Sequence, residues 1–321
     1  MVQTYALLLG PMLLEHYRFS QNAKFCKELY PVALRQIELF RKLIDDKGMI
    51  IPGSYSWLFI DHDAELYKET PSLGLYLFSL RRTAELGECL GMPHPELTKE
   101  AEKLSKLLFQ RCFDKETGLF RADDKNRQLS WATQVWFLLG EVVKGNAARQ
   151  VWSKMLKSPE AMRPHTPYLW CSVLEAGWML GKNADVRKII RDYWGGMLKR
   201  KLDTFPEVFV PENPMFSSYG DCLMNSDCHA WSACPIYFLA TAFAGVKPAE
   251  PFFRSVRITP NPGGLGRIRA TVPSPKGVIG VDLKFASGGD AGTISLPEGL
   301  SGTYEFMGRT LDLHPGTNEL K

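Results

Sequence analysis

A carboxylate, an imidazole and an indole occur close together in the segment 203–239 of the sequence. Glu207 follows a proline and lies between two aromatic residues, Phe205 and Phe209, and His229 and Trp231 come further along the same segment. Carboxylates move protons or activate water, and flat aromatic faces stack on the apolar faces of pyranose rings. This combination predicts a site that holds a sugar and hydrolyses its glycosidic bond.

The residues beside Glu207 are expected to control its protonation. Flanking aromatic and aliphatic side chains would desolvate the carboxylate and raise its pKa, as a base that works near neutral pH requires. The alternative is a solvated loop carboxylate. For His229 the alternative is a histidine at a helix start or in the core, and for Trp231 it is packing in the core.

A second acidic segment, SWLFIDHDAELYKET, lies within a long predicted loop. Asp61 follows an aromatic run, which makes it a candidate catalytic or sugar-binding carboxylate, with Trp57 and Asp63 as candidate substrate contacts. A surface turn that caps the next helix is the alternative. Together with His62 and Glu65 these aspartates could hold a metal ion, but the spacing matches no calcium-binding loop, so no metal is predicted.

Two more tryptophans are placed where they could line the same site. Trp131 opens a predicted helix, and Trp170 follows a proline-rich loop, so both are candidate substrate contacts at one mouth.

Composition limits the classes of function. The 321 residues are 45% hydrophobic and 23% charged with a net charge of +4, which is ordinary for a soluble protein. No basic run is interleaved with aromatic residues and no apolar run is long enough to span a bilayer, so neither nucleic acid nor membrane is a predicted partner. The seven cysteines form no CxxC pair. Their scattered spacing argues against a zinc site and favours free thiols, and no cofactor is predicted. Free thiols fit a cytoplasmic location, or a periplasmic one if an N-terminal part is missing.

Helical periodicity dominates the first three quarters of the sequence. Long segments joined by short loops predict antiparallel hairpins. Three connections are longer, 47–70, 114–129 and 201–229; long loops are usually functional, and these are expected to leave the same end of a ring of hairpins. The predicted helices cover 5–19, 23–46, 71–91, 96–113, 130–144, 146–157, 167–181, 184–200 and 230–244.

The pattern changes near residue 246. Short β-rich runs such as RIRATVPSP and GVIGVDLKF alternate with Gly- and Pro-containing turns. This indicates two domains, a helical domain over 1–246 and a C-terminal antiparallel β-sandwich over 247–321.

These features together resemble the bacterial α-L-rhamnosidases, a family of inverting glycoside hydrolases with an (α/α)6-barrel catalytic domain followed by a β-sandwich. The run from Cys228 to Ser232, CHAWS, matches the family segment C-H-x-W-S, whose histidine contacts the sugar. Glu207 occupies the place of the glutamate in T-x-W-E, the general base. The run WLFID that ends at Asp61 looks like the W-x-F-x-D loop.

The resemblance implies a rhamnose-containing oligosaccharide or glycoside as the partner. Two departures lie in the substrate site: Phe205-Pro206 stands where the family has tryptophan before the base, and His62 follows Asp61 where the family has tryptophan.

The resemblance also bears on the general acid. In the family this residue lies ahead of the first helix seen here, and a complete barrel needs more helices than the ranges above supply. Within this sequence the acid could only be Asp61, Asp63 or Glu65. The expectation is therefore a partial barrel that hydrolyses α-L-rhamnosides weakly or not at all and that self-associates. A carbohydrate-binding or inactive relative is the alternative; a sugar epimerase would need more converging histidines than six allow.

Overall fold

The computed structural model describes residues 2–20, 22–123, 125–286 and 289–320. The chain divides into two compact units. The helical unit comprises Met1–Leu14, Lys24–Gly181 and Asp192–Ser232, and the sandwich unit comprises Glu15–Ala23, Lys182–Arg191 and Ala233–Lys321.

The helices agree with the predicted ranges within a few residues at most ends. The largest differences are that 5–19 is interrupted at Leu8, that 23–46 ends at Arg41 and 130–144 ends at Leu139, and that 184–200 and 230–244 each contain a π-helical turn. In the last of these ranges the α-helix begins only at Pro235. The helices are α1 (Gln3–Leu7), α2 (Leu9–Phe19), α3 (Ala23–Arg41), α4 (Glu69–Leu90), α5 (Pro95–Cys112), α6 (Trp131–Leu139), α7 (Gly145–Lys157), α8 (Pro167–Met179), α9 (Asn183–Ile189), α10 (Gly195–Lys199) and α11 (Pro235–Phe238).

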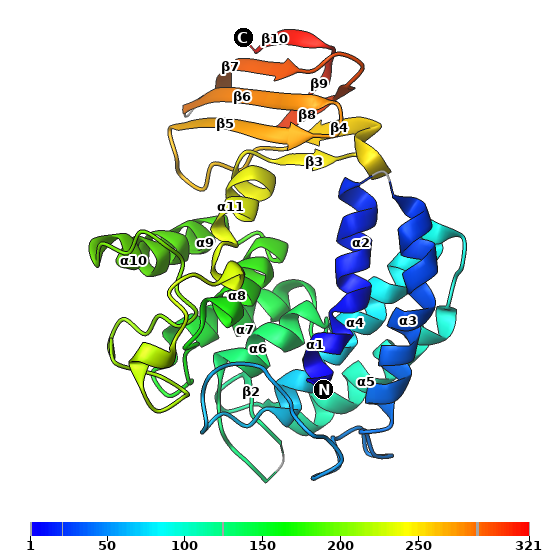
Figure 1. Ribbon diagram of the computed structural model, residues 1–321, viewed down its shortest axis with the longest axis vertical. Helices are drawn as coiled ribbons and strands as arrows, with labels where there is room; N and C mark the ends of the chain where they lie inside the picture. Colours follow the sequence, from blue (N-terminus) through cyan, green and yellow to red (C-terminus); the bar gives the residue numbers. More distant parts are fainter. Residues whose placement is uncertain (1, 21, 124, 287–288, 321) are drawn as a thin grey trace. The chain divides into compact units, whose positions relative to one another are not determined.

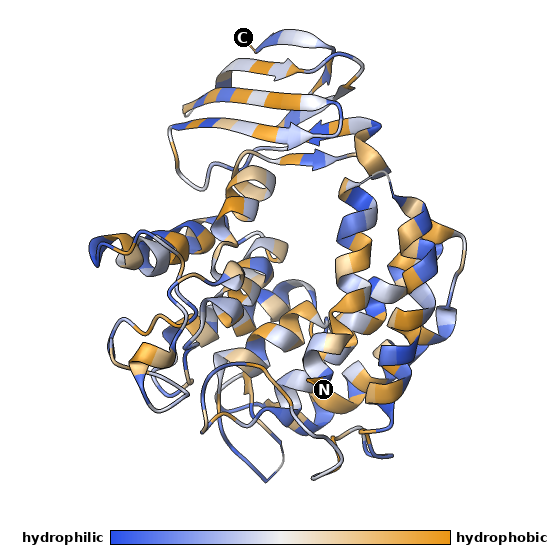
Figure 2. Ribbon diagram, viewed as in Figure 1, coloured by the Kyte–Doolittle hydropathy of each residue, from blue (hydrophilic) through white to orange (hydrophobic). Residues whose placement is uncertain are grey.

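Buried and amphipathic helices alternate from α4 to α8, whose arrangement is drawn in Figure 1. All nine residues of α6 and most residues of α4 and α8 are buried, whereas α5 and α7 bury only one face. Figure 2 shows the same contrast, since apolar and polar residues alternate around α5 and α7. A helix that is apolar all round belongs in a core, and one with an apolar stripe covers it. The buried helices α4, α6 and α8 therefore form the inner layer of this unit.

Local sequence signals fix where the inner helices begin. The Ser130 hydroxyl accepts a hydrogen bond from the Thr133 N–H at 3.1 Å at the start of α6. Thr166 caps α8 in the same way, and Pro167 occupies the first helical position. Caps of this kind satisfy backbone donors that the helix leaves unpaired. As a result, the loops before α6 and α8 end at defined points.

Helices α4 and α6 approach each other so closely at Gly74 that a larger side chain would force the two helices to shift. A Cβ atom added there would lie 2.7–2.8 Å from the backbone and Cβ of Trp136. Gly74→Ala should lower the free energy of unfolding by ~1–3 kcal/mol, as overpacking of a core does. Gly195→Ala is the control, because nothing lies within 4 Å of the added Cβ. Urea denaturation of both variants tests this, and equal stability would contradict the close packing.

The sandwich unit contains two four-stranded sheets, with strand orders β10-β7-β6-β5 and β3-β4-β8-β9. Apolar and polar residues alternate along the strands, as Figure 2 shows for the first sheet. The strands are β3 (Val246–Pro248), β4 (Ser255–Ile258), β5 (Arg267–Ser274), β6 (Gly277–Ala286), β7 (Gly289–Leu296), β8 (Ser301–Phe306), β9 (Arg309–Leu313) and β10 (Gly316–Leu320). The short hairpin of β1 (Phe113–Asp114) and β2 (Leu119–Phe120) belongs to the helical unit.

The two sheets face each other, and one pairing is not antiparallel. The Tyr304 hydroxyl on β8 donates to Asp290 Oδ2 on β7 at 2.7 Å, and the rings of Phe285 and Phe306 are 5.2 Å apart. Strands β4 and β8 are parallel, so the prediction of a purely antiparallel sandwich was wrong at this pair. The reason is that the chain runs through three strands of the other sheet, β5, β6 and β7, between them, and such a crossover can bring a strand back in the same direction.

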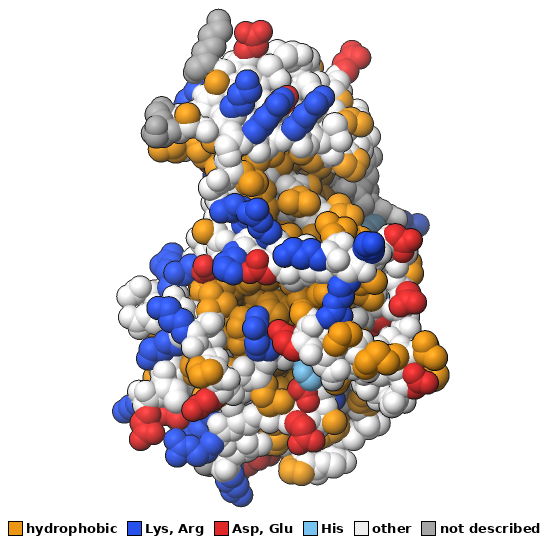
Figure 3. Space-filling model, turned by 90° about the vertical axis from the view of Figure 1, so that its left-hand side faces the viewer, with side chains coloured by type: hydrophobic (Ala, Val, Ile, Leu, Met, Phe, Trp, Pro, Cys, Tyr) orange, Lys and Arg blue, Asp and Glu red, His pale blue; other side chains and the backbone are white. Residues whose placement is uncertain are grey.

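Charged side chains of both signs are intermingled over the face seen in Figure 3. Within the described ranges, no helix combines the length and the apolar character needed to cross a bilayer.

Candidate functional site

Hydrogen bonds connect the loops that precede the inner helices of the helical unit. Gln128, before α6, donates through Nε2 to the carbonyl oxygen of Glu65 at 2.7 Å and accepts from the Tyr67 N–H at 2.9 Å. The Trp131 N–H donates to the carbonyl oxygen of Met162, before α8, at 2.8 Å. Two of the three long loops, 47–70 and 114–129, are therefore in contact, and the segment 158–166 lies against the start of α6.

Asp61 ties the loop before α4 to the start of α8. Its Oδ1 accepts from the Thr166 hydroxyl at 2.6 Å, the Thr166 N–H at 3.0 Å and the His62 N–H at 2.9 Å, and its Oδ2 accepts from the His165 N–H at 2.7 Å. The residue is 1% exposed. Burial raises the pKa of Asp61, whereas these hydrogen bonds favour the ionised form and act in the opposite direction.

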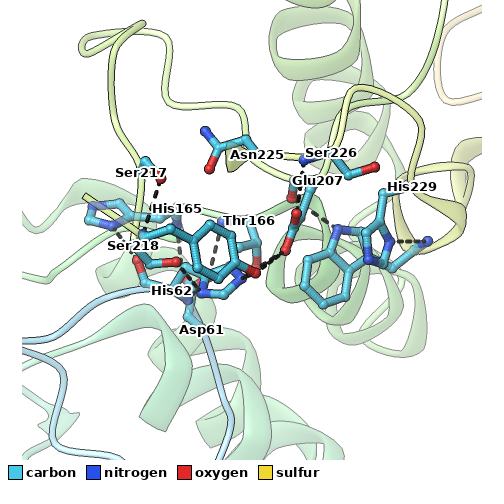
Figure 4. Close-up of polar contacts among 12 residues, drawn as sticks. Asp61, His62, His165, Thr166, Glu207, Ser217, Ser218, Asn225, Ser226 and His229 are labelled. Atoms are coloured by element: carbon cyan, nitrogen blue, oxygen red, sulfur yellow. Dashed lines mark hydrogen bonds and ion pairs between the residues drawn. The ribbon is translucent and has the colours of Figure 1, made fainter. Parts of the chain in front are cut away.

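Glu207 lies next to this loop, with its carboxylate turned toward His62 (Figure 4). Its Oε1 accepts from the Tyr219 hydroxyl at 2.6 Å and lies 3.1 Å from His62 Nε2, while its Oε2 accepts from the Ser226 N–H at 3.0 Å. The Glu207 N–H in turn donates to the Ser226 carbonyl oxygen at 2.7 Å. Although Glu207 belongs to a long loop, it is only 6% exposed. The carboxylate is therefore fixed in one orientation.

The predicted rise in the pKa of Glu207 was wrong. Burial does raise it, but the hydrogen bonds from Tyr219, Ser226 and His62, together with the His62 charge, outweigh burial and hold the pKa below its usual value. The hydrogen bond between Tyr219 and Glu207 and, as a smaller cause, burial raise the pKa of Tyr219 to about 12. This hydroxyl therefore stays protonated and remains a donor. Glu207 is consequently an ionised carboxylate at neutral pH.

An aromatic platform formed by Phe59, Tyr168, His229 and Trp231 lies beside Glu207. The Trp231 indole N–H donates to the Glu207 carbonyl oxygen at 2.9 Å. The Trp231 ring stacks on His229 with 4.0 Å between centroids and on Phe59 with 5.7 Å, and Tyr168 is 5.6 Å away. The His229 N–H donates to the Phe205 carbonyl oxygen at 2.6 Å, which fixes the platform to the Glu207 segment.

The other predicted site residues fall into two groups. Trp57 is 55% exposed and makes a T-shaped contact with Phe59 of the platform. Asp63 lies 3.7 Å from His165 Nδ1, in the loop that also carries Asp61. Trp131 and Trp170 are 4% and 5% exposed and pack against each other. The guanidinium of exposed Arg163 lies over both rings, so the two tryptophans are buried beneath this side chain.

Sequence reasoning missed three partners of Glu207, namely His62, Tyr219 and Ser226. His62 was considered as a metal ligand and as a departure from the family pattern in the substrate site, but not as a partner of Glu207. In the described part of the chain no group of three or more His, Cys, Asp or Glu side chains is arranged to hold a metal. The sequence held one signal for two of these partners, because Tyr219 and Ser226 lie in the same long loop as Glu207.

Comparisons with known proteins find similarity to α-L-rhamnosidases. The model of the bacterial alpha-L-rhamnosidase C-terminal domain matches residues 245–305. The chain is similar to a rhamnosidase from Klebsiella oxytoca with rhamnose bound, at 32% identity and a TM-score of 0.68 over 74% of this chain and 47% of that one. The comparison with curated protein sequences returns no match.

Two further structures show the same fold at lower identity. A GH78 family rhamnosidase of Bacillus sp. GL1 has a TM-score of 0.83 at 24% identity, covering 95% of this chain and 33% of that one. An α-L-rhamnosidase from Aspergillus terreus has a TM-score of 0.76 at 16% identity, covering 96% and 38%. The chain thus spans less than half of the length of each of these proteins.

Proposed function

Since the chain is related to the bacterial α-L-rhamnosidases over the C-terminal part of their catalytic domain and β-sandwich, we propose that it hydrolyses or binds α-L-rhamnosides at Glu207. The observation that carries this proposal is the buried, ionised Glu207 carboxylate, held by three donors beside an aromatic platform. We also propose that the helical domain is part of an (α/α)6 toroid and that the domain boundary lies at residue 246. The proposed substrate is a rhamnose-containing glycoside.

The proposed chemistry is inverting hydrolysis with Glu207 as the general base. A carboxylate oxygen accepts about two hydrogen bonds. Oε1 already has Tyr219 and His62, whereas Oε2 has only the Ser226 N–H. The remaining acceptor position on Oε2 would take the proton of the water that attacks the anomeric carbon.

The leaving oxygen needs a proton from a second carboxyl group, ~6.5–9.5 Å from the base in inverting enzymes. We propose that Asp61 orients the loop rather than donating this proton, because four donors occupy its oxygens. Of the remaining candidates, Glu65 is exposed, and Asp63 is partly buried near His165. Asp63 is therefore the first residue to test as the acid.

The aromatic platform is proposed to bind the sugar ring. His229 and Trp231 stack on each other beside Glu207, and exposed Trp57 could extend the apolar surface toward the rest of the glycoside. Trp131 and Trp170 would support the site from the core.

A panel of nitrophenyl glycosides of L-rhamnose, D-glucose, D-mannose and D-galactose tests the proposal. The α-L-rhamnoside should be the preferred substrate, with β-L-rhamnose as the first product seen by proton NMR. Preference for another sugar would refute the substrate, and α-L-rhamnose as the first product would refute the inverting mechanism. Binding of L-rhamnose without any hydrolysis would favour the carbohydrate-binding alternative.

A further inference from the structure

His62 contacts Glu207 through one ring nitrogen and Ser218 through the other. Nε2 is 3.1 Å from Glu207 Oε1, and Nδ1 is 2.8 Å from the Ser218 hydroxyl oxygen (Figure 4). The side chain is 11% exposed. Three rings surround the imidazole, with centroid distances of 5.1 Å to Phe59, 5.4 Å to Tyr219 and 5.9 Å to Trp231. The ring therefore has little freedom to rotate.

These contacts define the tautomer of the imidazole. An ionised carboxylate only accepts hydrogen bonds, so His62 Nε2 must carry the hydrogen that points at Glu207. In the neutral ring Nδ1 is then an acceptor, and the Ser218 hydroxyl donates to it. If the ring takes up a second proton, the same hydroxyl can accept from Nδ1 instead. Ser218 is thus a partner for His62 in both charge states.

We propose that His62 is a positioning residue for Glu207: its Nε2–H, together with the Tyr219 hydroxyl, holds Oε1 and leaves Oε2 to face the reacting water. This inference rests on the proposed role of Glu207 as the base. His62 does not touch the substrate in this account. It acts by fixing the rotamer and the charge of the carboxylate that does.

The groups that act on Glu207 come from two segments. His62 lies in the loop before α4, and Tyr219 and the Ser226 N–H lie in the loop after α10. Every donor to the carboxylate favours its ionised form. Removal of the His62 donor should therefore make Glu207 easier to protonate.

The test compares two substitutions of His62. In His62→Phe the donor is lost, so the protonation midpoint of Glu207, followed through its side-chain ¹³C carboxyl resonance, should rise by about one pH unit. In His62→Gln the amide –NH₂ can replace Nε2–H, so the midpoint should stay closer to wild type. His94→Gln is the matched control, because His94 bonds to Glu96 elsewhere in the helical unit. It should leave the midpoint unchanged.

Two results would overturn the inference. One is an unchanged midpoint in His62→Phe, or equal rises in both His62 variants, since neither fits a hydrogen-bond donor. The other is a ¹⁵N spectrum of His62 in which Nδ1, rather than Nε2, carries the hydrogen at neutral pH. Both measurements are independent of turnover.

Kinetics then separate this inference from the function itself. In rhamnoside hydrolysis His62→Phe should lower kcat more than it changes KM, and it should move the acidic limb of the profile to higher pH. Loss of activity in Glu207→Gln with no change in His62→Phe would refute the positioning role but keep the base. Full activity in Glu207→Gln would refute the assignment of Glu207 as the general base.

Discussion

Glu207→Gln is expected to lower the turnover of α-L-rhamnoside hydrolysis by about 10²–10⁴-fold, the range that a positioned general base contributes. The amide has nearly the shape of the carboxylate but cannot accept the proton of the attacking water. Binding of L-rhamnose should change little, because the platform of Phe59, Tyr168, His229 and Trp231 stays in place. Steady-state kinetics and calorimetry measure the two effects separately.

Glu212→Gln is the matched control for this substitution. Glu212 is an exposed glutamate in the same loop, and its loss should leave kcat unaltered. Near-native turnover in a correctly folded Glu207→Gln protein would show that another group activates the water. An equal loss in both variants would point to the charge of the loop rather than to one base.

Asp61→Ala is expected to lower the free energy of unfolding by roughly 2–4 kcal/mol, because four donors, two of them fully buried, lose their acceptor. The two loops that Asp61 joins would separate, and with them the start of α8 and the segment that carries His62. Urea denaturation monitored by fluorescence measures the loss. L-rhamnose should also bind more weakly, since the same loop carries exposed Trp57, a proposed sugar contact.

Asp203→Ala serves as the control, because Asp203 is exposed in another loop of the same unit and should be replaceable within ~0.5 kcal/mol. If Asp61→Ala proved as stable as wild type but inactive, the scaffold role would be wrong. Asp61 would then return as a candidate for the general acid.

The helix positions and the Glu207 segment were the parts that could be predicted from sequence. Periodicity and end signals are local, and so is the spacing that puts Glu207, His229 and Trp231 in one segment. The breaks in the helices were not predictable in this way. The interruption at Leu8 and the π-helical turns at Ile190–Trp194 and Leu239–Phe243 have no signal in the hydrophobic pattern.

The partners of Glu207 show why the rest could not be predicted. His62 is 145 residues away in the sequence, and only the convergence of two loops brings it within 3.1 Å. The residues beside Glu207 indicated desolvation, but no pattern showed the donors that reverse its effect on the pKa. Asp61 is a similar case. The residues next to it in the sequence do not indicate that its side chain is buried and accepts four hydrogen bonds.

The most direct test of a rhamnose site at Glu207 is a titration with L-rhamnose followed by NMR. The Glu207 side-chain ¹³C resonance and the Trp231 indole N–H resonance should shift together with one dissociation constant, and D-glucose at the same concentrations should leave both unchanged. Shifts confined to other residues, or equal responses to the two sugars, would contradict the account.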